Sequence, residues 1–229
     1  MAEWDGGEIM GRQPRIWYEA AMYHITNRGN SRRDIFPESS DRLVFLNKLG
    51  LLVKDHGLKI HAYCLMTNHY HLLIETDKVH ISDTMHALNT YYSKQHHKKY
   101  DTSGHLFQGR FGSVLVEKDA YLLEVSRYVH LNPVSAGLVE LPEDYTWSSM
   151  RVYMGLGVEK SLVYRENVLG FFSEDLEEAM EDYRRFVYAR LDNPDLLEGT
   201  ITYDDIMGSD SFASEVRERA TVPGTWGNM

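Results

Sequence analysis

Two histidines in the first third of the chain stand at a spacing that suits metal binding. The segment 68–75 reads NHYHLLIE, and its residues favour a β-strand. Alternate side chains of a strand share a face, so His69, His71 and Glu75 point one way and Tyr70 the other. Imidazoles about 7 Å apart at Cα suit Mg²⁺, Mn²⁺ or Zn²⁺ when a third nitrogen or oxygen ligand joins them. Taken alone, such a pair more often marks two half-exposed polar residues at a strand start.

A tyrosine and an asparagine form a second candidate group. Tyr128 and Asn132 stand four residues apart in a segment that predicts a helix from near Asp119 to close to Pro133. Both therefore lie on one helical face. A tyrosine hydroxyl is a nucleophile once its proton is removed, and an asparagine carbonyl oxygen is a ligand for hard metal ions. The structural alternative is that Tyr128 packs at the domain edge and Asn132 caps the helix.

The hydrophobic pattern outlines the framework that must position these groups. Its first six elements follow the order strand, helix, strand, strand, helix, strand, which suits a ferredoxin-like α+β fold. The prediction is an antiparallel sheet with helices on one face and an added helix that carries Tyr128. Strands are predicted at 22–26, 60–66, 69–74 and 113–117, and helices at 41–56, 82–99 and 119–132.

Charge and periodicity divide the chain into three predicted parts. Residues 1–14 form a loose leader, residues 15–155 the main domain, and residues 156–229 a mainly helical acidic extension with a helix at 174–188. The extension holds 16 Asp and Glu against 7 Lys and Arg. The net charge of −10 therefore belongs mostly to the extension, whereas residues 1–155 are close to neutral and hold all 11 histidines.

Composition excludes several classes of protein. A single cysteine, Cys64, excludes an intramolecular disulfide and a cysteine-based zinc cluster. No apolar run approaches the ~20 residues of a membrane span, and the first residues lack a signal-peptide pattern, so a cytoplasmic protein is expected. The acidic total argues against a generic basic nucleic-acid binder. That argument is weak for residues 1–155, because they are nearly neutral.

Several segments together resemble one family. The joint pattern is similar to the single-tyrosine HUH transposases, and within them to the REP-associated tyrosine transposases. The resemblance covers roughly residues 14–155. It is carried by HYH at 69–71, YVHLNPVSAGLV at 128–139, YHITNRGN at 23–30, GHLFQGRF at 104–111 and EDYTWSS at 143–149.

The resemblance implies a ferredoxin-like DNA-cutting domain that uses Mg²⁺ or Mn²⁺. Its DNA would be single-stranded or folded as a hairpin, as in repeated palindromic elements. His69 and His71 match the metal ligands, Tyr128 the nucleophile, and Asn132 a third ligand, for which Glu75 is the alternative. Tyr128 would form a 5′-phosphotyrosine and free a 3′-OH, so that strands can be rejoined in transposition. Some relatives exchange tyrosine helices within a homodimer, while others act alone.

Basic and aromatic residues of the main domain are the expected DNA contacts. For each basic residue, an ordinary position on the solvated surface is an equally good interpretation. His24, on the first predicted strand, either approaches the metal or is a structural histidine, and the second is favoured. Two other functions stay open: a domesticated hairpin-binding protein that does not cut, and a metal-dependent nuclease that uses water. The predicted DNA contacts are Arg28, Arg32, Arg33, Lys94, Lys98 and Arg110.

Overall fold

The first part of the chain alternates strands and helices as the sequence predicts. The computed structural model describes residues 15–157, 162–194, 202–203 and 205–221, so the leader predicted at 1–14 lies outside the described residues. The elements are β1 (Met22–Arg28), the 3-10 turn η1 (Asn30–Arg32), α1 (Ser39–His56), β2 (Lys59–Leu65), β3 (His69–Glu75), α2 (Ile81–Tyr100), β4 (Gly112–Val116) and α3 (Lys118–Ser135).

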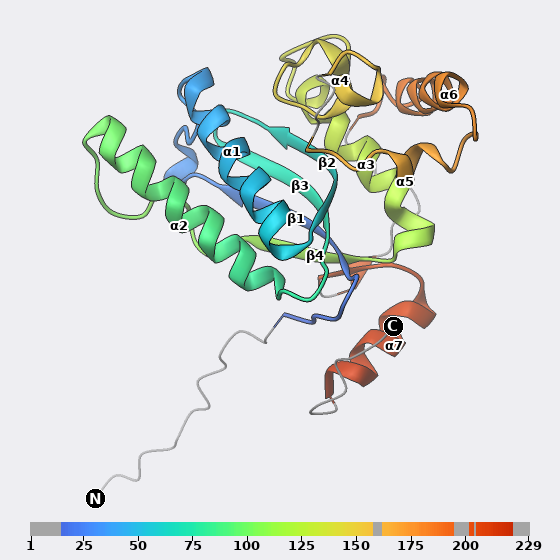
Figure 1. The fold of residues 1–229 in the computed structure, drawn as a ribbon, viewed down its shortest axis with the longest axis horizontal. Helices are drawn as coiled ribbons and strands as arrows, with labels where there is room; N and C mark the ends of the chain where they lie inside the picture. The colour runs from blue at the N-terminus through green and yellow to red at the C-terminus, as the bar shows by residue number, and fades with distance from the viewer. Residues whose placement is uncertain (1–14, 158–161, 195–201, 204, 222–229) are drawn as a thin grey trace, which may run out of the picture.

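The sheet has the ferredoxin-like strand order. Its first four strands lie in the order β2-β3-β1-β4, and every neighbouring pair among them is antiparallel. The helices α1 and α2 lie side by side over one face, and α3 covers the opposite face (Figure 1). The predicted fold, with a separate helix for Tyr128, is thereby confirmed.

Each face of the sheet has its own apolar core. Tyr70, Leu72 and Ile74 of β3 pack with Phe45 of α1 and Tyr92 of α2. On the other face, Leu73 packs with the residues that α3 turns inward, Leu122, Val125 and Val129. The alternation along β3 thus assigns odd-numbered side chains to the α3 face, which is the face of Tyr128.

The ends of α1 show how local signals set these elements. Glu38 and Asp41 form a reciprocal capping box at the start of the helix, and this satisfies backbone N–H groups that have no partner within the helix. Gly57 ends the helix at φ +67°, a conformation that costs glycine little. These caps fix where the chain turns back into β2.

The helix α3 runs further than the sequence predicts. It continues through Pro133 to Ser135, and the backbone N–H of Ala136 still donates to the carbonyl of Asn132. Proline removes its own N–H donor but leaves the donors that follow it intact. A proline in the last turn therefore does not stop the helix, and Asn132 lies inside α3 rather than at its end.

The C-terminal extension adds strands as well as helices. Before it, η2 (Pro142–Asp144) and α4 (Met150–Tyr153) follow α3 within the main domain. The extension itself contains α5 (Glu166–Leu169), α6 (Leu176–Tyr188), β5 (Thr202–Tyr203), β6 (Ile206–Met207) and α7 (Asp210–Thr221). The strand β6 pairs in parallel with β4 and extends the sheet to β2-β3-β1-β4-β6-β5. The sequence did not predict these two strands, because two-residue strands carry no periodic signal.

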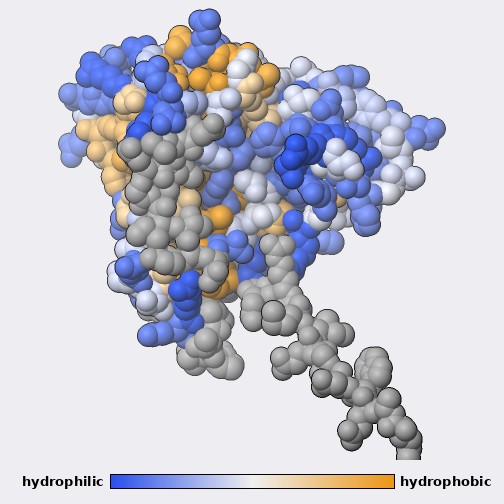
Figure 2. Space-filling model, turned by 180° about the vertical axis from the view of Figure 1, so that it is seen from behind, coloured by the Kyte–Doolittle hydropathy of each residue, from blue (hydrophilic) through white to orange (hydrophobic). Residues whose placement is uncertain are grey.

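The extension also packs against α3, the helix that carries Tyr128. Tyr183 and Val187 of α6 are fully buried in the core that α3 helps to form. Seen from behind, the half of the molecule with α4–α6 gathers hydrophobic residues, whereas the half with α1 and α2 is mostly hydrophilic (Figure 2). Among the described residues, no helix is both long and apolar enough for a membrane span.

Candidate active site

The histidine pair lies on the α3 face of β3, as the strand period predicts. His71 is buried and His69 is half-buried, and their ring centroids are 5.1 Å apart. Asn68 Oδ1 lies 2.7 Å from His69 Nδ1 and orients that ring. The two imidazoles therefore meet at the start of β3, and His69 is the more exposed of the two.

A third histidine joins the pair from the central strand. His24 of β1 stacks on His71 with ring centroids 5.2 Å apart, and His24 Nε2 lies 3.0 Å from His71 Nδ1. This bond occupies Nδ1 of His71 and leaves its Nε2 as the nitrogen that could face a metal. The sequence favoured a structural role for His24. The ferredoxin-like strand order, which makes β1 and β3 neighbours, was the signal that could have placed it at the site.

Burial keeps this cluster uncharged. It lowers the pKa of His24 to about 4. Burial also lowers the pKa of His71 well below its ordinary value, with smaller contributions from His24 and His69. The pKa of His69 is lowered by burial and by the nearby Arg28 guanidinium. The neutral form that these shifts favour is the form of histidine that binds a metal.

Tyr128 lies against the two stacked histidines of its own chain. Its ring is 5.7 Å from the rings of both His24 and His71, at nearly perpendicular angles. Val125 and Val129, on the same helix, are fully buried and hold α3 to the sheet. The structure therefore brings the predicted nucleophile and the predicted metal ligands together without a second subunit.

The two candidates for a third ligand differ in their surroundings. Asn132 Nδ2 donates to the Tyr128 carbonyl at 2.8 Å, which engages the amide nitrogen and not the oxygen that a metal needs. Glu75 accepts from Lys59 Nζ and Lys118 Nζ at 2.8 Å each and from His61 Nε2 at 3.1 Å.

The Glu75 carboxylate belongs to an ion cluster at the far end of β3. Burial by itself raises its pKa, but the bonds from His61, Lys118 and Lys59 outweigh burial and hold the pKa well below the ordinary value. Its oxygens are thus already engaged by cations, which favours Asn132 as the third ligand. Within the described ranges, no group of three or more His, Cys, Asp or Glu side chains is arranged to hold a metal. A site at His69 and His71 would need an amide or water oxygen to complete it.

The predicted DNA contacts occupy two regions. Arg28 donates to Gln108 Oε1, and Arg33 donates to the His105 carbonyl, so the two arginines tie the 104–111 loop to the end of β1 and to the segment after it. Lys94 and Lys98 lie exposed on α2, and Arg32 and Arg110 lie exposed in the turn and the loop. The structure thus gives Arg28 and Arg33 intramolecular partners that the sequence did not indicate.

The strand order defines a ferredoxin-like domain in which a tyrosine on a separate helix lies against a histidine cluster on the sheet. A family model described as "Transposase IS200 like" matches residues 18–132, which include His69, His71, Tyr128 and Asn132. The chain belongs to the IS200-like transposase family.

Individual relatives agree with this assignment. A Haemophilus influenzae protein named "Putative REP-associated tyrosine transposase" is 29% identical over 103 residues, a match that covers 38% of this chain and 56% of the relative's length. A solved structure of a REP-associated tyrosine transposase bound to a REP hairpin superposes with a TM-score of 0.53 at 18% identity. The superposition covers 65% of this chain and 89% of the other, and it supports the fold.

Proposed function

We propose that this protein is a DNA strand transferase in which Tyr128 attacks a phosphodiester of single-stranded, hairpin-bearing DNA. The observation that carries the proposal is the contact of the Tyr128 ring with the His24–His71 stack in the same chain. A phenol beside neutral imidazoles on a ferredoxin-like sheet matches the chemistry of the family. The acidic total charge is no obstacle, because the excess lies in the extension.

Each residue would have a separate task. His69 and His71 would hold Mg²⁺ or Mn²⁺ through neutral ring nitrogens, and Asn132 would supply an oxygen. The bound ion would withdraw charge from the scissile phosphate and stabilise the charge that develops there. His24 would orient His71 through the hydrogen bond at Nδ1. The α3 helix would hold Tyr128 in reach of the phosphate.

The proposed reaction conserves the energy of the phosphodiester. The Tyr128 oxygen loses its proton and bonds to phosphorus, and the bond from phosphorus to the 3′ oxygen breaks. The products are a 5′-phosphotyrosine and a 3′ oxygen that takes up a proton to become a hydroxyl. A 3′-OH from another strand reverses the step and joins new ends without ATP. A nuclease that uses water would lose this energy.

The proposed partner is DNA with a short palindromic hairpin. A relative in the same fold is solved with a REP hairpin bound, and this chain exposes Arg32, Lys94, Lys98 and Arg110. These cations would contact phosphates. Because the substrate is cellular DNA, a cytoplasmic location belongs to the same proposal. A homodimer is not required to bring Tyr128 to its histidines.

Trapping the covalent intermediate tests the proposal. The protein is incubated with hairpin-bearing single-stranded DNA and Mn²⁺ or Mg²⁺, then denatured, and a DNA-linked band is expected. Tyr128→Phe keeps the ring that packs on His71 and removes only the hydroxyl, so it should bind the same DNA without forming the band. DNA cleavage that survives in Tyr128→Phe would identify a nuclease. Hairpin binding with no band in the unsubstituted protein would identify a binding protein that does not cut.

A further inference from the structure

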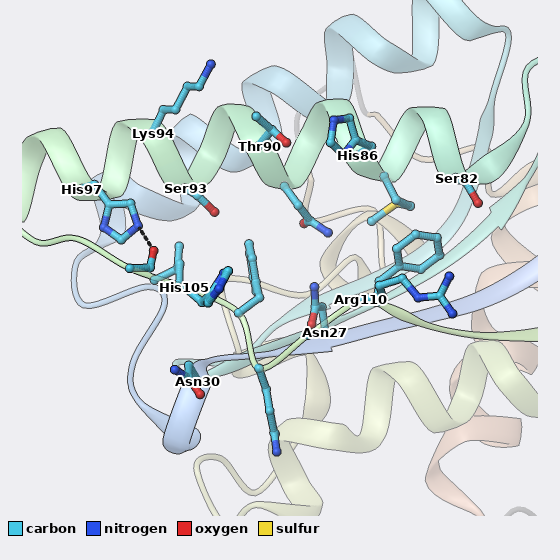
Figure 3. Close-up of a pocket in the computed structure, with 18 of the residues that line it drawn as sticks. Asn27, Asn30, Ser82, His86, Thr90, Ser93, Lys94, His97, His105 and Arg110 are labelled. Carbon is cyan, nitrogen blue, oxygen red and sulfur yellow. Dashed lines mark hydrogen bonds between the residues drawn. The ribbon is translucent and has the colours of Figure 1, made fainter. Parts of the chain in front are cut away.

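The two faces of the sheet are covered in different ways. Over one face, α2 and the 104–111 loop leave a cavity of about 970 Å³ between them, with Ser93 directed toward the loop and Asn27 of β1 beneath (Figure 3). Over the other face, α3 contacts β2 and β3 on one side and α6 of the extension on another. The contact between α3 and α6 bears on the candidate active site, because α3 carries Tyr128.

Buried polar side chains join α6 to the side of α3 that lies opposite Tyr128. Ser126 and His130 stand four residues apart and share one side of the helix, whereas Tyr128, two residues from each, points to the other side. Tyr183 of α6 reaches both of them, because its Oη lies 2.7 Å from His130 Nδ1 and 3.1 Å from Ser126 Oγ. Ser126, His130 and Tyr183 are all fully buried. One hydroxyl of the extension is therefore bonded to two successive turns of the helix that carries Tyr128.

His130 also ties α3 to the sheet. Its Nε2 lies 2.6 Å from Oγ of Ser149, the residue that precedes α4. Ser149 Oγ in turn accepts from the backbone N–H of Tyr63 in β2 at 2.8 Å. Tyr63 pairs with Leu72 of β3, which is the neighbour of His71 in the chain. The His130 imidazole thus links α6 to the two strands that hold the candidate metal ligands in place.

The protons of these hydrogen bonds run in one direction. Ser126 donates its proton to the Leu123 carbonyl at 2.8 Å, so Ser126 Oγ accepts from the Tyr183 hydroxyl. Because Tyr183 has then used its proton, His130 Nδ1–H donates to it, and Nε2 is left to accept from Ser149. Linked hydrogen bonds in a buried environment strengthen one another, and they are directional, unlike apolar contacts. They can therefore fix the rotation and the axial position of α3, which apolar packing against the sheet does not do alone.

We propose that Tyr183 is a positioning residue for Tyr128. Its hydroxyl, acting through Ser126 and His130, holds α3 in the place from which Tyr128 reaches the stacked histidines. A reacting group has to be held within about 0.5 Å of its productive position, and a displacement of about 1 Å can slow a reaction by about a hundredfold. The proposal rests on the proposed function and gives α6, an element of the extension, a part in it.

Tyr183→Phe and a matched control test the proposal. Tyr183→Phe keeps the buried ring and removes the hydroxyl. The control, Tyr153→Phe, removes the hydroxyl of a fully buried tyrosine whose ring lies 4.6 Å from that of Tyr183 and whose Oη donates to the His61 carbonyl of β2. Both changes remove a buried hydroxyl from the same core, but only the first removes hydrogen bonds to α3. Thermal melting verifies that both variants fold.

The first measurement follows the covalent band in time at a series of hairpin concentrations with Mn²⁺. Tyr183→Phe should lower the maximal rate of band formation about tenfold and leave the half-saturating hairpin concentration unchanged, because the nucleophile is displaced and the DNA contacts are not. Tyr153→Phe should keep both values. The proposal would be overturned by an unchanged rate in Tyr183→Phe, by an equal fall in both variants, or by a change confined to the half-saturating concentration.

The second measurement follows Tyr128 without any reaction. A 3-fluorotyrosine in place of Tyr128 gives a fluorine resonance that senses the rings of His24 and His71, 5.7 Å away. This resonance should shift or broaden in Tyr183→Phe and stay in place in Tyr153→Phe, and identical spectra in the two variants would refute the positioning role. If the unsubstituted protein forms no covalent band with any hairpin, the proposed function fails, while the fluorine spectra still decide whether Tyr183 positions Tyr128.

Discussion

His130 makes the stability of the protein depend on pH in a way that can be calculated. It is fully buried in α3, two residues from Tyr128, with Nδ1 2.7 Å from Tyr183 Oη and Nε2 2.6 Å from Ser149 Oγ. One ring nitrogen donates and the other accepts, so the neutral ring satisfies both hydroxyls. Burial lowers the pKa of His130 to about 3.

The direction in which pH changes the stability follows from comparing the protonation of His130 in the unfolded and the folded chain. The unfolded chain takes up a proton at His130 as the pH falls through about 6.5, whereas the folded protein does not until about pH 3. The stability that the neutral His130 provides is therefore complete above pH 6.5 and is lost on acidification. Between pH 7 and pH 5, protonation of this one unfolded side chain lowers the free energy of unfolding by about 2 kcal/mol.

Urea unfolding at pH 7, 6 and 5 measures this effect. In His130→Gln the titrating group is absent, so the loss of unfolding free energy between pH 7 and pH 5 should be about 2 kcal/mol smaller than in the unsubstituted protein. His24 and His71 stay in both proteins, and their contribution cancels in the difference. His105→Gln, which makes the same substitution in the exposed loop, is the control for the exchange of histidine for glutamine. An equally steep loss in His130→Gln would refute the reasoning.

Three further outcomes are expected. His24→Ala removes the partner of His71 Nδ1, so Mn²⁺ binding, measured by calorimetry, should weaken roughly tenfold while the affinity for the hairpin stays the same. An unchanged Mn²⁺ affinity would contradict the proposal that His24 orients His71. Gly29→Ala should lower the free energy of unfolding, measured in urea, by about 2 kcal/mol or more, because the added Cβ would lie 2.0 Å from the Arg33 carbonyl oxygen. A change below about 0.5 kcal/mol, the size of an ordinary surface substitution, would contradict this steric argument. Truncation after residue 155 should abolish the cooperative unfolding transition, as followed by circular dichroism, because it removes the buried side chains of Tyr183 and Val187 from the core under α3. A sharp transition in the fragment would show that the main domain folds without the extension.

The sequence predicts those parts of the molecule in which local patterning decides the structure. The alternation of β3 placed His69 and His71 on the face opposite Tyr70, and the helical spacing placed Tyr128 on the same helix face as Asn132. Both signals involve residues within one element. The resemblance to a family then joined the two elements into one site, which neither spacing could do alone.

The features that the sequence did not predict depend on contacts between distant residues. His24 meets His71 only because β1 and β3 are neighbours in the sheet. The partners of Arg28 and Arg33 are a loop more than seventy residues away in the chain. The strand β6 is two residues long, and its place beside β4 is set by the way the extension wraps around the domain. The cavity at α2 likewise needs two distant segments to exist.

The pairing of the outer strands has a consequence for how copies of the protein meet. One edge of the ferredoxin-like sheet, β4, is covered by β6 at Leu115 and Val116, and the other, β2, forms isolated bridges with Val163 and Ser148. An open strand edge is a template on which a second chain can add its own strand. Here residues that follow α3 occupy both edges, and within the described part of the chain the new outermost strand, β5, spans only Thr202–Tyr203. The sheet is thus protected against growth by edge-to-edge addition, and two copies that associate would have to do so through side chains rather than through a shared sheet.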